Sequence, residues 1–430
     1  MLSSPASILN VVDFPQPDGP TKTKNSSSLP SRLKLLIILF CSNFIFSDSY
    51  FPNETWEKKS ASELGLSEEK VNLLIEKSFE DKATMGAVII KDGYIVSEKY
   101  ARGFNENSYG TSWSTAKSFY AALIGISLDK GEIKSLDEPV ANYVDSYNSQ
   151  SKKDITIREI LNMTSGLEFP SHEHEMMFFE EDHLKYALEV EVENPPGEKF
   201  QYNNVNSMLI GEILKGATGK TAKQLIEERI FSKIGIKNYT AWEDAAGNTM
   251  TYCCLDMSAR DYSKFGLLFS RDGNWDGEQV VSKSYVDESL QLYWGKTPSM
   301  GWTHSDTRGY SLQWWISKYD DEAKIYNTSG KFGQFVFIDK ERDIIFTRIT
   351  KYYPSGGEVQ KFGPLTYLKF LGSVNAALNV SRFLYDIGLI NFEDGNVQTP
   401  YTLAEGESKE FYENYVDIVD LMADLENVEE

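Results

Sequence analysis

Strand-like segments lie near both ends of this chain, and helical patterns fill the long stretch between them. Near the amino end, GAVIIKDGYIVSEKY (residues 86–100) holds two β-rich runs divided by Asp92-Gly93, a dipeptide that favours a tight hairpin turn. Near the other end, YSLQWWIS (310–317) and GQFVFIDKERDIIFTRIT (333–350) return to strand character. This pattern favours one antiparallel sheet that is assembled from segments far apart in the sequence.

The stretch between the strands carries amphipathic patterns that end near glycines. They are TIREILNM (156–163), NSMLIGEILKGATG (206–219) and SARDYSKFGLLFSRDG (258–273). We therefore expect an α+β fold, with an antiparallel sheet flanked by helices and an all-helical subdomain. The expected boundaries are 51–395 for the whole domain, about 51–130 and 305–395 for its α/β part, about 131–304 for its helical part, 364–389 for a late helix, and 396–430 for an acidic C-terminal segment.

The first 50 residues read as a leader rather than as part of the fold. Residues 33–40, LKLLIILF, follow basic Arg32 and are too short for a confident membrane span, as in a secretory signal. We expect export to the periplasm or the extracellular space and no stable membrane insertion after leader removal, although an uncleaved leader would tether the protein. The alternative is a buried N-terminal strand.

The overall charge and the cysteines exclude several classes of function. A formal net charge of −21 repels phosphate backbones, so we expect no nucleic-acid partner. Only three cysteines occur, and no CxxC pattern is present. Cys253 and Cys254 are neighbours that could pair only through a strained ring, so the sequence indicates no disulfide framework.

Ser114-Thr115-Ala116-Lys117 fits the pattern S-x-x-K. The same spacing recurs at Ser31/Lys34, Ser67/Lys70, Ser127/Lys130 and Ser149/Lys152. At Ser114 alone a loop runs into an apolar helix, expected over 114–130, whose unpaired N–H groups favour developing negative charge. Lys117 lies one turn further on the same face, and burial would make its amine neutral enough to accept the serine proton. A plain helix N-cap with a solvated lysine is the alternative.

A second candidate is Tyr202-Asn203-Asn204, which follows the Pro195-Pro196-Gly197 turn. A tyrosine just before a helix can project its phenol into a cleft, where it could act as a base or proton relay. The alternative is a tyrosine packed on a helix start that Asn204 caps.

A third candidate is the segment Thr328 to Gln334, just before the strand FVFID. Gly330 would let a substrate backbone approach the strand closely, and the next N–H could complete an oxyanion hole. The alternative is an ordinary turn.

Five segments in this order resemble the class C β-lactamase-related serine hydrolases, and most of all the 6-aminohexanoate-dimer hydrolases and family VIII esterases. They are SWSTAKSFYAALIGISLDKGEI, TIREILNMTSGLEF, PPGEKFQYNNVNSMLIGEIL, ARDYSKFGLLFSRDGNW and GKFGQFVFIDKERDIIF, which together cover roughly residues 84–350. The resemblance implies a serine hydrolase with its site between an antiparallel sheet and a helical subdomain.

The same resemblance implies roles for single residues. Ser114 would be the nucleophile, Lys117 its proton acceptor, and Tyr202 the base that later protonates the leaving group. Asn204 would donate a hydrogen bond to the substrate. The backbone N–H groups of Ser114 and Lys331, beside Gly330, would form the oxyanion hole.

One departure from the family bears on the substrate. β-Lactamases and penicillin-binding proteins of this superfamily usually carry Lys or His where this chain has Thr328, and that cation meets a substrate carboxylate. A small neutral amide or ester therefore fits better than a β-lactam or a D-Ala-D-Ala peptide. A catalytically silent binding protein with the same fold remains a second alternative.

A metal site is the other rival. His172, His174 and His183 lie close together among acidic residues, and two imidazoles could face a metal from an extended loop. No H-E-x-x-H helix is present, so we favour a variable acidic loop and expect no metal or other cofactor.

Overall fold

The structure, a computed structural model, describes residues 50–169, 177, 180–293, 308–319, 323–350, 361–362, 384, 387, 389 and 409–426. Apart from Tyr50, the leader-like segment lies outside these residues, as do His172, His174 and nearly all of the expected helix over 364–389. No helix in the described part of the chain is long and apolar enough to cross a membrane.

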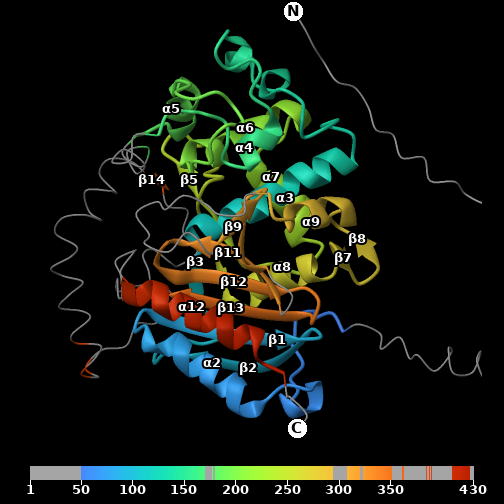
Figure 1. The fold of residues 1–430 in the computed structure, drawn as a ribbon, viewed down its shortest axis with the longest axis vertical. Coiled ribbons are helices and arrows are strands. Elements are labelled where there is room, and N and C mark those ends of the chain that lie inside the picture. Colours follow the sequence, from blue (N-terminus) through green and yellow to red (C-terminus); the bar gives the residue numbers. More distant parts are fainter. Residues whose placement is uncertain are drawn as a thin grey trace, which may run out of the picture. The chain divides into compact units, whose positions relative to one another are not determined.

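A seven-stranded antiparallel sheet forms the centre of the fold, with the strand order β2-β1-β13-β12-β11-β10-β9 (Figure 1). Its strands are β1 (Thr84–Lys91), β2 (Tyr94–Tyr100), β9 (Gly309–Ser311), β10 (Trp314–Tyr319), β11 (Lys324–Gly330), β12 (Gln334–Asp339) and β13 (Ile344–Thr350). Strand β1 pairs with β13, and Val88 lies opposite Thr347, so segments from the two ends of the chain meet in one sheet. The expected α+β class is confirmed.

The hairpin between β1 and β2 forms at the predicted dipeptide. Asp92 and Gly93 both have positive φ angles, of 53° and 85°. A two-residue turn with two left-handed residues matches the twist of the strands that it joins.

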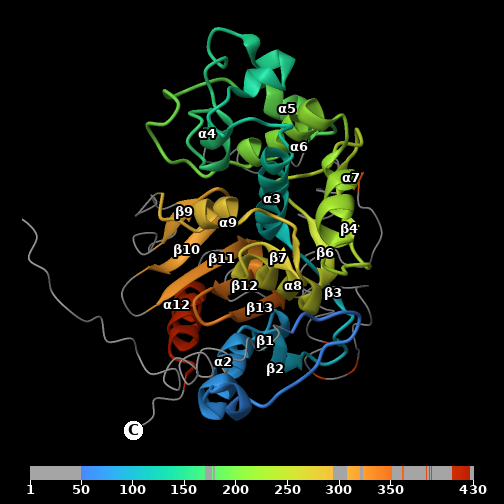
Figure 2. The same ribbon diagram turned by 90° about the vertical axis from the view of Figure 1, so that its right-hand side faces the viewer.

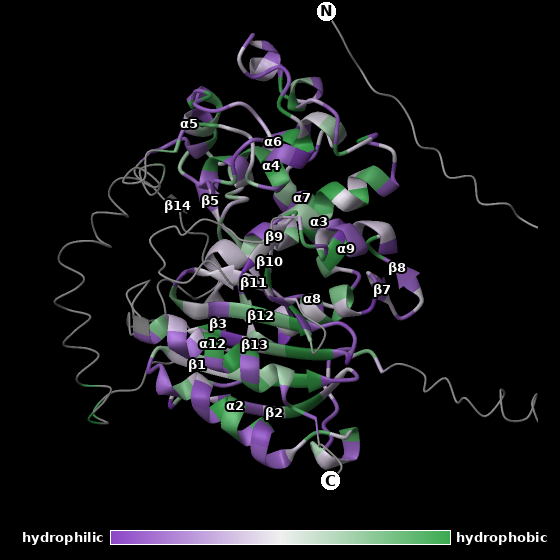
Figure 3. Cartoon of the chain, in the orientation of Figure 1, coloured by the Kyte–Doolittle hydropathy of each residue, from purple (hydrophilic) through white to green (hydrophobic). Residues whose placement is uncertain are grey.

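Two helices from opposite ends of the chain cover one face of the sheet: α2 (Glu68–Glu80) and α12 (Lys409–Ala423) (Figure 1). Apolar side chains of α12, among them Phe411, Tyr415 and Ile418, are buried in one cluster with Phe335 and Phe337 of β12. Figure 3 shows the matching pattern, in which both helices alternate hydrophilic and hydrophobic residues while the central strands are mostly hydrophobic. Within the acidic C-terminal segment expected over 396–430, residues 409–423 thus form a helix whose apolar side chains pack against the sheet.

The opposite face of the sheet is covered by α8 (Ala259–Ser270). Gly266 permits this close approach, since a Cβ atom there would lie 2.8 Å from both Ile345 and Val336 side chains. We expected this segment in the helical subdomain, at residues 258–273. That expectation is corrected, because the apolar face of α8 packs on β12 and β13.

Most of the remaining helices and short strands come from the middle of the chain. The helices are α3 (Ala116–Asp129), α4 (Ile157–Leu161), α5 (His183–Glu189), α6 (Asn204–Thr218), α7 (Ala222–Ile226) and α9 (Lys283–Ser289), with short turns at Ser62–Leu64, Trp113–Thr115 (η2), Val140–Asn142, Asp145–Asn148, Glu227–Phe231 and Lys331–Gly333 (η8). The short strands are β3 (Tyr109–Thr111), β4 (Thr240–Ala241), β5 (Glu243–Asp244), β6 (Leu255–Ser258), β7 (Asn274–Trp275), β8 (Glu278–Gln279) and β14 (Lys361–Phe362). The subdomain is therefore not purely helical.

Helix α3 is the element that joins the helical part to the sheet (Figure 2). Every residue from Ala116 to Ser127 is buried, so the helix has no solvent face. A helix that is apolar on all sides must lie inside a core. Its first turn can therefore present side chains only to an interior site or cleft.

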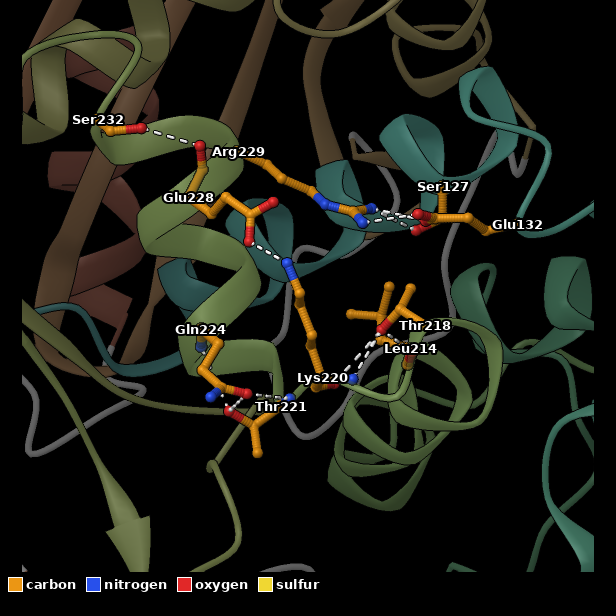
Figure 4. A network of polar contacts seen from close by, with 10 residues as sticks. All are labelled: Ser127, Glu132, Leu214, Thr218, Lys220, Thr221, Gln224, Glu228, Arg229 and Ser232. Atoms are coloured by element: carbon orange, nitrogen blue, oxygen red, sulfur yellow. Dashed lines mark hydrogen bonds and ion pairs between the residues drawn. The ribbon is translucent and has the colours of Figure 1, made fainter.

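An ion pair fixes the far end of α3 to the segment that follows α7 (Figure 4). Arg229 donates two hydrogen bonds of 2.7 Å to the carboxylate of Glu132 and one of 3.1 Å to Ser127 Oγ. The guanidinium is nearly buried, and the carboxylate is about one quarter exposed. The neighbouring pair between Lys220 and Glu228 is more exposed at both ends.

We expect Arg229→Met to destabilise the protein, because it removes the guanidinium that donates to the Glu132 carboxylate and to Ser127 Oγ. Since Glu132 is partly hydrated, the loss in the free energy of unfolding should be about 1–3 kcal/mol, less than for a fully buried pair. Urea unfolding monitored by circular dichroism measures it. Lys220→Met is the matched control and should cost under about 0.5 kcal/mol, as exposed pairs do. Equal losses in the two variants would show that Arg229 has no special role.

Candidate active site

Ser114 lies in η2, a single turn that runs directly into α3. Strand β6 fixes the position of this turn, because the Ser112 N–H donates to the Leu255 carbonyl and Ser112 Oγ accepts from the Leu255 N–H, both at 2.7 Å. Trp113 and Thr115 are buried, whereas Ser114 is partly exposed. The serine hydroxyl is thus the accessible polar group of a rigid turn.

Lys117 is buried directly behind Ser114. Its Nζ lies 2.7 Å from Ser114 Oγ, 2.8 Å from Asn204 Oδ1 and 2.7 Å from the Tyr252 carbonyl oxygen. Burial lowers the pKa of this amine well below its ordinary value. A neutral amine fits these contacts, since its two N–H groups can donate to the two carbonyl oxygens while its lone pair accepts from the Ser114 hydroxyl.

Tyr202 reaches the same serine from the loop before α6. Burial raises the pKa of this phenol well above its ordinary value, and this outweighs the hydrogen bond with Ser114 and the charge of Arg308, which both lower it. The Tyr202 ring stacks on Trp315, with 5.5 Å between ring centroids, and lies 5.1 Å from Lys117 Nζ. The pKa of the Lys117 amine is therefore lowered and that of the Tyr202 phenol is raised, as suits a proton acceptor and a proton donor.

The two asparagines after Tyr202 make different contacts. Asn203 is the N-cap of α6, because its Oδ1 accepts from the Val205 N–H at 2.9 Å. The alternative prediction from the sequence, a cap formed by Asn204, is therefore corrected. Since Asn203 caps the helix, the Asn204 side chain is directed at Lys117 instead.

The third segment, the end of β11 and the turn η8 (Lys331–Gly333), lies against the turn that carries Ser114. A Cβ atom on Gly330 would lie 2.1 Å from the Ser112 carbonyl oxygen, so only glycine fits there. Thr115 Oγ1 donates to the Gln334 carbonyl at 3.1 Å, and the rings of Trp113 and Phe332 meet edge to face at 5.6 Å.

Thr328 lies on the same face of β11 as Gly330, because side chains two residues apart share a face. It is fully buried, and its hydroxyl has no hydrogen-bond partner among the described residues. Strand β10 pairs with β11 only up to Asn327, so the edge of the strand from Thr328 to Gly330 is not covered by β10.

The histidine hypothesis can be examined only at His183. This residue is buried at the start of α5, its Nδ1 lies 3.0 Å from Tyr252 Oη, and burial lowers its pKa to about 4. Among the residues that the structure describes, no group of three or more potential ligands could hold a metal ion. His183 therefore belongs to the core that supports the Tyr252 segment.

Cys253 and Cys254, the two residues after Tyr252, are joined by a disulfide.

The chain matches the model of a known protein family over two thirds of its length. Residues 74–361 match the family model described as Beta-lactamase. The chain belongs to the beta-lactamase family. The resemblance to β-lactamase-related serine hydrolases is thereby confirmed, and so is membership of a superfamily of hydrolases that includes amidases, esterases and peptidases.

Individual relatives of this beta-lactamase-family protein are distant. It is 20% identical to the 6-aminohexanoate-dimer hydrolase of Paenarthrobacter ureafaciens, over 65% of this chain and 75% of that protein. It is 27% identical to a D-aminopeptidase of Brucella anthropi, over 38% of this chain and only 34% of that protein.

Solved structures with the same fold are equally distant in sequence. A putative 6-aminohexanoate-dimer hydrolase from Bacillus anthracis has a TM-score of 0.57 and 20% identity, and covers 73% of this chain and 82% of its own. A family VIII carboxylesterase has a TM-score of 0.54 and 18% identity, over 69% and 93% of the two chains. These likenesses concern the fold.

Sequence reasoning missed two features that support the site. The Tyr252 carbonyl contacts Lys117 through the backbone, so no residue type could have signalled it. Asp256 of β6 was also missed. It is buried beside the turn that carries Ser114 and accepts hydrogen bonds from Thr111 Oγ1 at 2.8 Å and Trp242 Nε1 at 2.9 Å. Burial raises the pKa of Asp256 to about 7, although both hydrogen bonds lower it.

Asp256 should therefore make the stability of the fold depend on pH. Because its folded pKa is raised, the carboxyl stabilises the fold most below pH 4, and this contribution is lost as the pH rises towards and through 7. In Asp256→Asn, Nδ2 can donate to Thr111 while Oδ1 accepts from Trp242. The variant should gain stability relative to wild type between pH 5 and 8, by up to about 1.4 kcal/mol per pH unit.

Urea unfolding at each pH gives the difference between variant and wild type, which cancels the titration of other groups. Asp145→Asn makes the same chemical change at an exposed position, and its difference from wild type should stay flat. A flat difference for Asp256→Asn as well would mean that Asp256 is ionised throughout this range.

Proposed function

We propose that this beta-lactamase-family protein is a serine hydrolase that cleaves small neutral amides or esters through an acyl-enzyme on Ser114. The observation that carries the proposal is the 2.7 Å contact between Ser114 Oγ and Lys117 Nζ, an amine whose pKa burial lowers. A neutral amine at hydrogen-bonding distance can remove the hydroxyl proton, which is what a serine needs to become a nucleophile.

In the acylation step, the Lys117 amine takes the proton of Ser114 Oγ while this oxygen attacks the carbonyl carbon of the substrate. Negative charge then passes to the carbonyl oxygen. The backbone N–H groups of Ser114 and Lys331 are its proposed donors, and the start of α3 adds a favourable dipole. The positions of Gly330 and Gln334 against the turn of Ser114 support this role for Lys331.

Tyr202 is proposed to complete the proton transfer. Its phenol donates to the leaving nitrogen or oxygen as the tetrahedral intermediate collapses, and the Lys117 ammonium returns a proton to it. A water molecule then attacks the acyl-enzyme, and its proton reaches Ser114 Oγ by the reverse path. The raised pKa of Tyr202 supports this assignment, because the side chain is a phenol at neutral pH and can donate.

The absence of a charge at position 328 supports a neutral substrate. Thr328 is buried on the face that meets the turn of Ser114, and it offers a hydroxyl where a cation would attract a carboxylate. Relatives named as a 6-aminohexanoate-dimer hydrolase, a D-aminopeptidase and a carboxylesterase represent amide and ester substrates alike.

Three variants should each lower kcat by about a thousandfold or more: Ser114→Ala, Lys117→Ala and Tyr202→Phe. Because the three groups act as one unit, double variants should add little. Turnover of p-nitrophenyl butyrate gives kcat, and mass spectrometry after treatment with a fluorophosphonate shows acylation of Ser114.

Ser149→Ala is the control, since Ser149 is an exposed serine that belongs to another S-x-x-K pair, with Lys152. It should keep wild-type kcat and labelling. A catalytically silent protein would show no label on wild type, and unchanged kcat in Tyr202→Phe would remove the phenol from the mechanism.

We also expect a clear order of substrates. Wild type should hydrolyse p-nitrophenyl esters and short linear amides, with kcat/KM for nitrocefin lower by about 10- to 100-fold, since the loss of one charge-assisted hydrogen bond of about 1.5–3 kcal/mol corresponds to one to two orders of magnitude. Parallel initial-rate assays under one set of conditions measure it. Nitrocefin hydrolysis at the rate of the esters would instead favour a β-lactamase.

A further inference from the structure

A buried arginine lies beneath the turn that follows the proposed oxyanion donor. Arg348 of β13 is fully buried on the face of the sheet that α12 covers. Its Nε donates to the Gly333 carbonyl at 3.0 Å, and its Nη1 donates to Asn414 Oδ1 of α12 at 2.9 Å. The third nitrogen, Nη2, lies where a Cβ atom on Gly333 would be, at 2.1 Å. The guanidinium therefore fills the space beneath η8.

The backbone of η8 requires external support. Phe332 and Gly333 have φ angles of 65° and 85°, which places two successive residues in the left-handed region. A bulky residue in this region is held there only when its surroundings enforce it. Here Trp113 packs against the Phe332 ring, and Arg348 binds the Gly333 carbonyl.

Asn414 connects this arginine to the helices on the outer face of the sheet. While its Oδ1 accepts from Arg348, its Nδ2 donates to the Lys77 carbonyl of α2 at 2.9 Å. Asn414 is buried, as is the arginine. A chain of hydrogen bonds thus runs from the end of α2 through α12 and Arg348 to η8.

Packing alone does not explain a guanidinium at this position. Removing it from water is costly, and apolar side chains often replace buried ions without loss of stability. The Phe335 ring, 4.9 Å from the guanidinium carbon, returns part of that cost through a cation–π contact. What an apolar side chain could not supply is a donor for the Gly333 carbonyl.

We propose that Arg348 is a positioning residue for the oxyanion donor: its guanidinium, held by Asn414, fixes the turn Lys331–Gly333 and through it the backbone N–H of Lys331. This inference rests on the proposed function, in which that N–H binds the developing oxyanion. Because donors must lie at the position where charge appears, a shift of about 1 Å can cost up to a hundredfold in rate.

The experiment compares Arg348→Met with Arg348→Lys in the full chain. A reversible boronic acid, which forms a tetrahedral adduct on a serine, reports binding of the transition-state geometry. We expect Arg348→Met to lower kcat and to weaken boronate binding by about 10- to 100-fold each, with KM within about twofold of wild type. Arg348→Lys keeps a cationic donor and should recover part of both losses.

Arg271→Met is the matched control, because Arg271 is also mostly buried but pairs with Asp343 and the Tyr50 carbonyl. It should lower the melting temperature and leave kcat and boronate affinity unchanged. If Arg348→Met does not fold, Asn414→Leu keeps the guanidinium but removes the oxygen that holds it, together with the donor to the Lys77 carbonyl, and a smaller loss in the same two quantities is expected.

Failure of the proposed function and failure of the positioning role give different results. Wild type that is not labelled on Ser114 by a fluorophosphonate contradicts the proposed function. Labelled wild type together with a folded Arg348→Met, or a folded Asn414→Leu, of wild-type kcat and boronate affinity contradicts only the positioning role. Equal losses in Arg271→Met would also overturn it, because the effect would then reflect general destabilisation.

Discussion

The site depends on a lysine amine kept away from water. Lys117 meets three oxygen atoms from three parts of the chain: Ser114 in the turn η2 before α3, Asn204 on α6 and the carbonyl of Tyr252. Burial disfavours the ammonium, whereas three oxygens at hydrogen-bonding distance limit that penalty. The helical part must therefore close over α3 for the amine to have these properties, so the fold and the chemistry share one requirement.

The sheet positions the strand segment that lies against the turn of Ser114. Antiparallel pairing of β1 with β13 fixes β11 and β12 in the same sheet, and Gly330 then meets the carbonyl of Ser112. Behind them, α2 and α12 close the far face of the sheet and hold Arg348 through Asn414. Helix α12 is thus connected to the turn Lys331–Gly333 through Arg348.

Much of this could be predicted from local patterns, and the failures have physical causes. The Asp92-Gly93 hairpin depends on neighbouring residues alone, so the sequence indicates it correctly. The helix expected over 114–130 forms at Ala116–Asp129, after the turn that holds Ser114. The location of α8 and the burial of α12 were misjudged, because an amphipathic pattern says that one face is buried but not against which element. The N-cap of α6 was assigned to the wrong asparagine for a similar reason. Either side chain can cap a helix, but Asn204 binds the amine of Lys117, which is distant in sequence, and Asn203 is the cap.

By itself, the sequence determined the family, the fold class and which hydroxyl, amine and phenol carry the proposed chemistry. These follow from residue type and short spacing, which are properties of the chain. The tertiary structure alone decided the surroundings of Lys117, the raised pKa of Asp256 and the contact between Arg348 and Gly333. Those features depend on desolvation and on backbone atoms that come together from distant parts of the sequence. A local run of residues determines neither of them.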